Sequence, residues 1–419
     1  MPKINILDRE TAELIAAGEV IERPASVVKE LVENSIDAGA TAITVEIGHG
    51  GVRLIRVTDN GCGIEREDVP KAFLRHATSK VLRPEDLDRI GTLGFRGEAL
   101  ASICAVSETE ILTRAATEEI GTRYTLAGEC AGELAEAGCP VGTTITAKNL
   151  FYNVPARMKF LKKDSTEGTA VATLMDRLAL SHPEIAFKLI RDREVKLATP
   201  GSGDLLAAIF AVYGNEFGRG LIPVECENGP IRVSGYLARP ECCRPSRSME
   251  HFFINNRYVK SVTIMAAVEE SYRNHIMVGK FPGCIINLAV DPSQVDVNVH
   301  PAKTVVKFQN ERAVFDAVHY TVKDLLTAGE TPAPKPVQQT FYRSMSVQEY
   351  KERQTPPPAE KRPLGSYGSA PAVHPDAKLP LRDSVSPPAP AAPEPREEPR
   401  PAPMPAAPAT FPAAEKTVP

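Results

Sequence analysis

Between Pro24 and Gly39, apolar residues recur at a helical spacing. The apolar positions are Val27, Val28, Leu31, Val32 and Ile36. At about 100° per residue they form a single arc, which predicts an amphipathic helix. Proline is tolerated in the first turn of a helix and glycine is favoured just past its end, so both ends of this helix are marked.

Shorter patterns predict the remaining elements. Residues 42–47 and 52–58 read as two strands, joined in a hairpin through His49-Gly50-Gly51. We expect further helices at residues 66–75, 98–105, 164–181 (with Asp164 as N-cap), 205–213, 262–273 and 311–326. We expect further strands at residues 121–126, 143–148, 231–238, 251–258, 284–290 and 305–308.

Composition divides the 419-residue chain into a folded part and a tail. From Thr331 onward it holds 22 of its 37 prolines, a composition that cannot bury enough apolar surface to order itself. We therefore expect a disordered linker or tail at residues 331–419. The rest is the length of two average domains, and the pattern changes near Gly203, which predicts domains at residues 1–203 and 204–330.

Charge and cysteines narrow the class of protein. A net charge of −4 gives no global reason to expect a polyanionic partner, although local basic patches remain open. The eight cysteines form no C-x-x-C pair, so reduced thiols are expected rather than a zinc site. The sequence shows neither a signal peptide nor a long apolar run, which predicts a cytoplasmic protein without a membrane partner.

Glu30 and Asn34 are the first candidates for chemistry. Four residues apart on a helix, they share a face. A carboxylate there can take a proton from an attacking water, and an amide oxygen suits Mg²⁺, which prefers oxygen ligands. Glu33 and Asp37 repeat the same spacing, so a solvated polar face explains the spacing equally simply.

Asp59 is the second candidate. It continues the strand face that carries Ile55 and Val57, so its carboxylate should enter a largely apolar pocket and need a donor, for which an adenine amine would serve. Gly61 and Gly63 would let a flat base approach the backbone. The alternative is an ordinary Asp-Asn-Gly turn capped by the aspartate.

Glycine-rich stretches suggest an anion site, although the chain contains no P-loop motif. Residues 91–97 place three glycines before a predicted helix start, where backbone N–H groups can bind phosphate; a flexible loop is the alternative. Thr78, Ser79 and Lys80 add two hydroxyls and a cation. Thr143, which opens a predicted strand, could hydrogen-bond near a base or be a plain strand residue.

In this order, the motifs resemble the N-terminal half of the MutL family, the DNA mismatch-repair ATPases of the GHKL superfamily. The similar stretches are residues 15–20 (IAAGEV), 23–35 (RPASVVKELVENS), 37–40 (DAGA), 59–64 (DNGCGI), 76–80 (HATSK), 94–101 (GFRGEALA), 151–157 (FYNVPAR) and 295–303 (VDVNVHPAK). They span about 300 residues, and GFRGEAL is nearly diagnostic. DNA gyrase B and histidine kinases share the superfamily but not these strings.

The resemblance implies roles that spacing could not assign. Glu30 looks like the base that activates water, and Asn34 like the Mg²⁺ ligand. Lys303 looks like a residue that reaches the γ-phosphate of ATP from the second domain; without the family it would be read as a solvated loop lysine. The implied ATP-binding residues are Asn34, Asp59, Gly63, Thr78, Ser79, Lys80, Gly94, Phe95, Arg96, Gly97 and Thr143.

The implied fold is α+β. A Bergerat-type GHKL ATPase sandwich is followed by an α/β domain like domain 2 of ribosomal protein S5. The implied function is an ATP-gated clamp, with ATP and Mg²⁺ as cofactors, whose N-terminal domains form a homodimer when ATP binds. It would link MutS to a downstream nuclease and helicase, working in the cytoplasm at the nucleoid. The alternative is a nucleotide-binding scaffold with negligible turnover.

Weak, sequence-blind DNA binding is expected through a basic cluster. Its members are Arg157, Lys159, Lys162 and Lys163, with Arg257 and Lys260 as additions; a solvated basic loop is the alternative. The chain stops inside its proline-rich tail, where full-length relatives continue into a dimerisation domain. The string DQHA, typical of the endonuclease motif there, does not occur in the sequence. The sequence therefore gives no support for strand nicking or for constitutive dimerisation by this chain.

Overall fold

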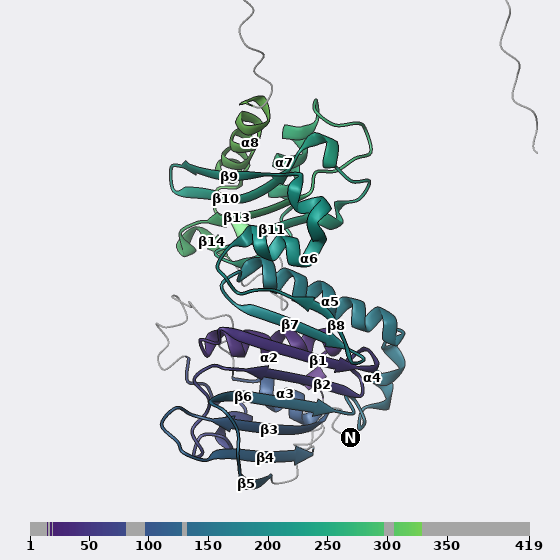
Figure 1. Cartoon of the computed structure of the whole chain (residues 1–419), viewed down its shortest axis with the longest axis vertical. Helices are drawn as coiled ribbons and strands as arrows, with labels where there is room; N and C mark the ends of the chain where they lie inside the picture. The colour runs from purple at the N-terminus through teal and green to yellow at the C-terminus, as the bar shows by residue number, and fades with distance from the viewer. Residues whose placement is uncertain are drawn as a thin grey trace, which may run out of the picture. The chain divides into compact units, whose positions relative to one another are not determined.

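A computed structural model describes residues 15, 17, 18, 20–80, 97–127, 132–296 and 306–328, and every structural statement below concerns these residues (Figure 1). They form two larger sheets and a two-stranded ribbon, with helices packed against the larger sheets. Both larger sheets are mostly antiparallel, each with one parallel pair of strands. This arrangement confirms the expected α+β class.

The first sheet has eight strands in the order β5-β4-β3-β6-β2-β1-β7-β8, and only β1 and β7 pair in parallel. Its strands are β1 (Ala42–Gly48), β2 (Leu54–Asp59), β3 (Glu108–Arg114), β4 (Gly121–Ala127), β5 (Glu133–Ala137), β6 (Gly142–Lys148), β7 (Ala186–Arg191) and β8 (Glu194–Ala198). One residue from each of β6, β2, β1 and β7 pairs in register with the next, and together they form a buried row across the sheet: Ile145, Val57, Val45 and Leu189.

Helices cover that buried row, as Figure 1 shows for α2 and α5. The helices of this part are α2 (Pro24–Asp37), α3 (Ala99–Ala105), α4 (Pro155–Phe160) and α5 (Asp164–Ser181). Val28 and Leu31 of α2 share one apolar core with the sheet and with Met175 of α5. Because burial of such an apolar face stabilises the fold, it fixes which side of α2 is left for polar residues.

The second sheet has five strands in the order β12-β11-β13-β10-β9. Its strands are β9 (Leu221–Asn228), β10 (Ile231–Ala238), β11 (Glu250–Ile254), β12 (Arg257–Val259) and β13 (Cys284–Ala289). Its helices are α6 (Leu205–Arg219), α7 (Val262–Tyr272) and α8 (Glu311–Ala328). The ribbon consists of β14 (Val295–Asp296) and β15 (Lys307–Phe308).

Both faces of this sheet are covered. Phe252 and Ile254 of β11 belong to the core with α7 and α8, whereas Phe253 between them belongs to a cluster with α6. Leu180, near the end of α5, joins that second cluster and so links the two sheets through apolar contact. Short 3₁₀ helices lie at η1 (His49–Gly51), η2 (Lys71–Phe73), η4 (Pro240–Cys242), η5 (Arg247–Met249) and η6 (Pro292–Gln294).

Two predicted elements were wrong. Instead of a helix, residues 66–75 hold turns and the three-residue η2. Pro70 has no N–H to donate to the carbonyl four residues earlier, which interrupts the helical ladder. The strand predicted at 251–258 is two strands, β11 and β12, because Asn255 and Asn256 adopt φ of 49° and 65° and form a tight turn between them.

Other differences concern elements that were not predicted. Strands β3, β5, β7, β8, β9 and β14 and helix α4 were missed. The predicted end of a helix at residue 213 coincides with a break inside α6, where Gly214 adopts a non-helical φ of 80° and ψ of 174°; a second helical piece continues to Arg219. Lys163, not Asp164, occupies the N-cap position of α5, and neither side chain caps the helix end. The expected tail at residues 331–419 lies outside the described residues.

Candidate functional site

Helix α2 presents Glu30 and Asn34 one turn apart, as expected, on the side of the helix that is not buried against the sheet. Both side chains are half-buried. The arc Val27, Val28, Leu31 and Val32 is buried, so the orientation of the polar pair is fixed by the packing of the opposite side.

Lys29 connects the two carboxylates of this helix. Its Nζ lies 3.0 Å from Glu30 Oε1 and 3.0 Å from Glu33 Oε2. Burial raises the pKa of Glu33 above its usual value, although the Lys29 ammonium opposes that shift. Burial would lower the pKa of Lys29, but Glu33 and Glu30 together raise it. The ammonium therefore holds both candidate bases in place.

Asp59, at the end of β2, is held by three hydrogen bonds. Ser35 Oγ of α2 donates to Oδ2 over 2.7 Å. The backbone N–H groups of Gly61 and Thr143 donate to Oδ1 over 2.9 and 3.2 Å. The carboxylate is thus both the cap of a tight turn and a rigidly oriented acceptor. Ser35, which directly follows Asn34, ties this carboxylate to α2.

Gly63 and Thr143 hold the loop around Asp59. Gly63 has φ of +74°, and a Cβ there would stand 2.1 Å from the carbonyl oxygen of Arg114, so a structural reason for glycine exists without any ligand. Thr143 Oγ1 lies 3.0 Å from Thr113 Oγ1, and Thr113 Oγ1 also accepts from the N–H of Ile64. These bonds link β3, β6 and the Asp59 loop.

Lys80 reaches back to α2. Its Nζ lies 3.0 Å from Asn34 Oδ1 and 2.5 Å from Asp37 Oδ2. The Lys80 N–H donates to Thr78 Oγ1 over 3.1 Å, which fixes the backbone beside it. The structure therefore brings together two stretches that the sequence separates by more than forty residues, residues 30–37 and 78–80.

The backbone at Gly97 contacts the backbone of residues 76 and 77. The His76 N–H donates to the Gly97 carbonyl over 3.0 Å, and a Cβ on Gly97, whose φ is +62°, would stand 2.6 Å from the carbonyl oxygen of Ala77. Residues 77 and 97 are therefore held together at the two ends of the intervening segment. Gly94, Phe95, Arg96 and Lys303, also proposed for the site, lie outside the described residues.

Comparison with known proteins places this geometry in a family. The family described as "Histidine kinase-, DNA gyrase B-, and HSP90-like ATPase" matches residues 21–131, and "DNA mismatch repair protein, C-terminal domain" matches residues 209–327. The chain is 46% identical over 370 residues to DNA mismatch repair protein MutL of Agathobacter rectalis, and 48% identical over 328 residues to that of Symbiobacterium thermophilum. These alignments cover 88% and 78% of the chain.

The chain belongs to the MutL family of DNA mismatch repair proteins. It spans 57% and 52% of the lengths of those two MutL relatives. The first matched family contains the expected GHKL ATPase fold. The resemblance seen in the sequence motifs is therefore confirmed.

Solved structures agree with the MutL assignment. A structure titled as the N-terminal domain of a DNA repair protein matches with a TM-score of 0.66 at 29% identity, over 76% of this chain and 98% of that one. The Aquifex aeolicus MutL ATPase domain complexed with ADP matches with a TM-score of 0.50 at 28% identity, over 71% and 98% of the two chains. The GHKL ATPase-like fold is thus confirmed, whereas the roles of individual residues remain predictions.

The residues present fit a magnesium nucleotide of the kind the MutL family implies. The Asn34 amide oxygen already accepts a hydrogen bond from a cation, the Lys80 ammonium, which shows that this oxygen is oriented to bind a cationic group. Asp59 keeps an oriented carboxylate that can accept further hydrogen bonds. Mg²⁺ bound at Asn34 would supply charge neutralisation for phosphate groups.

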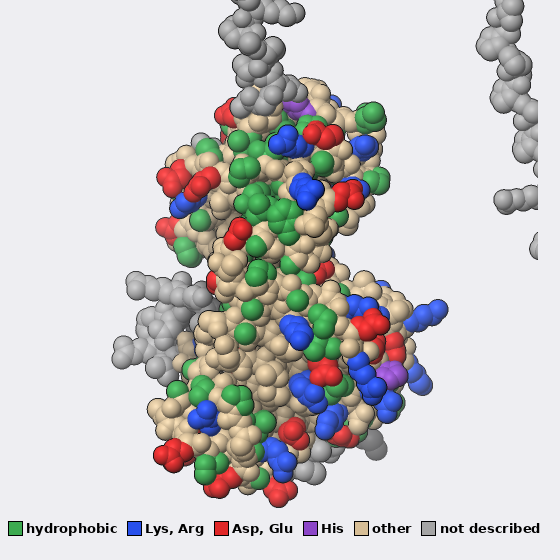
Figure 2. Space-filling view, viewed as in Figure 1, with side chains coloured by type: hydrophobic (Ala, Val, Ile, Leu, Met, Phe, Trp, Pro, Cys, Tyr) green, Lys and Arg blue, Asp and Glu red, His purple; other side chains and the backbone are tan. Residues whose placement is uncertain are grey.

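The basic cluster predicted to contact DNA is only partly a free surface. Lys159, Lys162 and Lys163 are exposed, and Lys and Arg side chains gather over α4 and the neighbouring end of α5 (Figure 2). Arg157 instead donates to the Ile21 carbonyl over 2.9 Å, and its guanidinium occupies the space that a Cβ on Gly18 would need. Arg157 therefore packs against Gly18 and holds the backbone at Ile21.

The remaining two predicted DNA residues lie in the second sheet region. Lys260 is exposed, whereas Arg257 is half-buried. The positive charge of Arg257 makes only a small contribution against the raised pKa of Glu33. Arg257 is therefore less accessible than Lys260 to a DNA phosphate.

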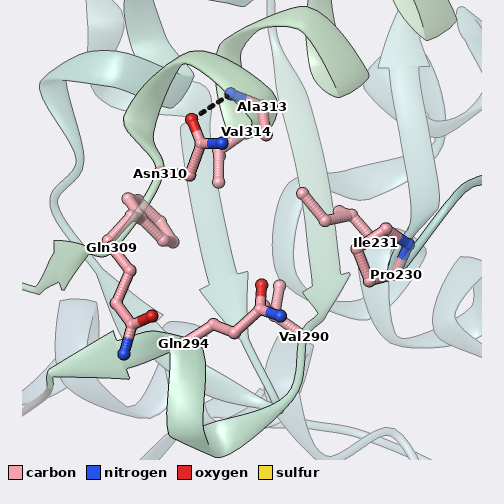
Figure 3. A pocket seen from close by; sticks show the side chains of 9 residues that line it. Pro230, Ile231, Val290, Gln294, Gln309, Asn310, Ala313 and Val314 are labelled. Atoms are coloured by element: carbon pink, nitrogen blue, oxygen red, sulfur yellow. Dashed lines mark hydrogen bonds between the residues drawn. The ribbon is translucent and has the colours of Figure 1, made fainter.

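A hollow of about 380 Å³ lies apart from these residues, between β10, η6 and the first turn of α8 (Figure 3). Its lining includes Ile231, Val290, Gln294, Asn310 and Val314. None of its lining residues was predicted for the nucleotide site. Asn310 uses its side-chain oxygen to cap α8 at the Ala313 N–H.

Sequence reasoning missed four residues of the site. They are Lys29, Ser35, Asp37 and Thr113. Lys29 and Ser35 could have been suspected, because each is adjacent in sequence to a proposed site residue. Thr113 belongs to a strand that was not predicted, and the pairing of Asp37 with Lys80 is a tertiary contact without a local sequence signal.

Two further observations concern only the described part of the chain. Its cysteines are free thiols, and no group of three or more His, Cys, Asp or Glu side chains is arranged to hold a metal ion. None of its helices is both long enough and apolar enough to cross a membrane.

Proposed function

We propose that this protein binds and hydrolyses ATP as the switch of a MutL-type mismatch repair system. The observation that carries the proposal is the Ser35–Asp59 hydrogen bond of 2.7 Å. It joins the proposed base-recognition turn to the helix that carries Glu30 and Asn34. The match to a MutL ATPase domain solved with ADP supports the same reading.

Each residue has a defined task in this proposal. Asp59 accepts a hydrogen bond from the adenine amine, with Gly63 and Thr143 shaping the pocket around it. Glu30 accepts a proton from the water that attacks the terminal phosphate. Thr78, Ser79, Lys80 and residues 94–97 contact the phosphates. Asn34 holds Mg²⁺ and Lys303 neutralises negative charge on the γ-phosphate, because phosphoryl transfer needs mainly positioning and charge neutralisation.

We propose a division of labour along the chain. Residues 1–203 form the ATPase domain, residues 204–330 form an S5-like domain that carries Lys303, and residues 331–419 form a linker. The family matches at 21–131 and 209–327 support boundaries of this kind. The apolar cluster that contains Leu180, Ile209 and Phe253 offers a route by which the first domain can influence the second.

Partners follow from the MutL family. ATP binding would bring two N-terminal regions together as a homodimer, and the dimer would connect MutS with a nuclease and a helicase. DNA would bind weakly through the phosphate backbone at Lys159, Lys162 and Lys163, with Lys260 as an addition. Endonuclease activity is not part of the proposal.

A scaffold that binds nucleotide with little turnover is the second candidate. Two described contacts favour it: Lys29 engages Glu30 at 3.0 Å, and Lys80 engages Asn34 at 3.0 Å. Both the proposed base and the proposed metal ligand therefore have other partners. Hydrolysis would require these contacts to rearrange, which suits a slow switch.

Single-turnover phosphate release from Mg²⁺-ATP tests the proposal. Glu30→Ala should retain ATP binding while hydrolysis falls by roughly a hundredfold or more, as expected for loss of a general base. Glu33→Ala is the matched control, since Glu33 shares Lys29. If hydrolysis persists in Glu30→Ala and is lost in Glu33→Ala, the base is Glu33. If the unaltered protein binds ATP but releases no phosphate, the scaffold reading holds.

A further inference from the structure

The Lys80 ammonium sits between two oxygens of α2. Its Nζ is 3.0 Å from Asn34 Oδ1 and 2.5 Å from Asp37 Oδ2. Asn34 and Asp37 are three residues apart in one helix, so their side chains lie on the same side of it. The Asp37 side chain is only 7% exposed and the Lys80 side chain 22% exposed, so this contact is largely shielded from solvent.

An amide oxygen and a carboxylate oxygen that converge on one point make a pair of hard ligands. Such oxygens are what Mg²⁺ and Mn²⁺ bind, at about 2.1 Å for Mg²⁺. The ammonium that now bridges them is itself a cation. A divalent ion bound to Asn34 Oδ1 would stand within a few ångströms of that ammonium, where the repulsion between like charges is strong.

We propose that Lys80 acts as an internal cation that occupies the Asn34–Asp37 oxygen pair and keeps divalent metal out until nucleotide arrives. Asp37, which sequence spacing left as part of a polar face, then becomes the second oxygen of the cation site. Nucleotide phosphates draw the ammonium away from α2 and so remove it from both oxygens. This last step rests on the proposed function; the exclusion of metal by Lys80 does not.

The backbone supports a movable side chain on a fixed base. The Thr78 hydroxyl accepts from the Lys80 N–H at 3.1 Å, and the Gly97–His76 hydrogen bond of 3.0 Å fixes the neighbouring chain. The backbone beside Lys80 is therefore held by hydrogen bonds that do not involve its ammonium. A lysine stem has several rotatable bonds, so the charge can move without unfolding the loop.

A purely structural ion pair is the competing explanation. It would fasten residue 80 to α2, and any cationic side chain of suitable length would serve. A structural pair affects folding stability but gives no reason for metal affinity to rise when the lysine charge is removed. Metal affinity without nucleotide therefore separates the two explanations.

The test measures Mn²⁺ binding to the nucleotide-free protein by electron paramagnetic resonance, with thermal melting as a folding check. Lys80→Met should bind Mn²⁺ about tenfold or more tighter than the unaltered protein, because one buried positive charge beside the site is gone. Lys80→Arg, which keeps the charge, should behave like the unaltered protein. Lys71→Met is the matched control, since it removes an exposed lysine that pairs with Asp68.

A second substitution identifies the oxygens. Adding Asp37→Asn to Lys80→Met should abolish the gain in Mn²⁺ affinity. Equal Mn²⁺ affinity in Lys80→Met and the unaltered protein overturns the proposal, as does a gain of the same size in Lys71→Met. Should Lys80→Met not fold, Lys80→Gln supplies the same comparison with a polar neutral side chain.

The outcome is separable from the proposed function. Binding of a fluorescent ATP analogue to the unaltered protein, measured in parallel, reports on nucleotide recognition alone. Absence of nucleotide binding together with a Mn²⁺ gain in Lys80→Met would reject the ATPase proposal and leave the cation site standing. Normal nucleotide binding without the Mn²⁺ gain would do the reverse.

Discussion

At the scale of single residues, the site depends on groups whose positions are fixed by neighbours. Asp59 illustrates this, because its two oxygens accept from Ser35, Gly61 and Thr143. Gly61 belongs to the same turn, whereas Ser35 and Thr143 come from distant parts of the sequence. The turn could be read from the sequence; the orientation of the carboxylate could not.

Asp59→Asn should weaken adenine nucleotide binding while the protein stays folded. The asparagine oxygen can still accept from Gly61 and Thr143, and the Ser35 hydroxyl can accept from the new amide. That amide, however, presents a donor to the adenine amine and leaves the amine unpaired, which costs about 1–3 kcal/mol. Calorimetry with ADP measures the loss, and Ser35→Ala is the control for carboxylate orientation. Unchanged affinity would make Asp59 a structural turn residue.

At the scale of elements, local signals succeeded where burial on one face is strong. Helix α2 and the β1–β2 hairpin were predictable because their apolar periods and end residues agree. Edge strands β5 and β8 were missed, since most of their side chains are exposed and give no clear alternation. The helix predicted at residues 66–75 was wrong because its apolar spacing was given more weight than the helix-breaking effect of Pro70.

Helix α4 and the residues after it carry the lysines that we expect to bind DNA phosphates. Reversing Lys159, Lys162 and Lys163 to glutamate should flatten the dependence of log affinity on log salt, by about 0.9 for each phosphate that the variant no longer neutralises. Arg157 is left unchanged because it holds the Ile21 carbonyl. Reversal of three exposed lysines elsewhere, Lys71, Lys280 and Lys323, is the matched control. An identical salt slope in both triple variants would place the DNA surface elsewhere, with Lys260 next to test.

We expect the stability of the fold to depend on pH because of Glu250 in strand β11. Burial raises the pKa of Glu250 to about 8, and neither of its oxygens has a hydrogen-bond partner within the described structure. Because this pKa is higher in the folded than in the unfolded state, its contribution is complete below the unfolded value of 4.5 and is lost as pH rises through about 8. Glu250→Gln should therefore raise Tm more at pH 8 than at pH 5.

The neighbouring histidine acts in the opposite direction and serves as the internal check. Burial lowers the pKa of His251 to about 4, so its contribution is present above the unfolded value of 6.5 and is lost as pH falls through about 4. Glu250→Gln should leave that acid-side loss in place. A Glu250→Gln variant whose Tm follows pH as in the unaltered protein would show that Glu250 is not the titrating group.

At the scale of the whole molecule, the sequence identified the family but could not supply the contacts between distant segments. The Lys80–Asp37 pair and the Leu180 cluster join stretches that no local pattern relates. Where the role of a residue depends on such a contact, that role could be predicted only from the resemblance to the MutL family. Lys303 is the clearest case, since its own surroundings in sequence give only a loop lysine.

Lys303→Ala should lower hydrolysis and weaken ATP binding more than ADP binding, because only ATP carries the phosphate that the ammonium would contact. Strands β14 and β15 pair as a ribbon, and Val295 and Phe308 pack with the core of the second sheet region, so the residues that flank the segment containing Lys303 are held there. Lys307→Ala, an exposed lysine of the same ribbon, is the matched control. Compared with residues 1–330, a chain ending at residue 203 should bind ATP poorly. Its rate of hydrolysis should fall further than its affinity for ATP. Equal rates of phosphate release from those two chains would show that the second domain contributes nothing to the site, and the role of Lys303 would then be wrong.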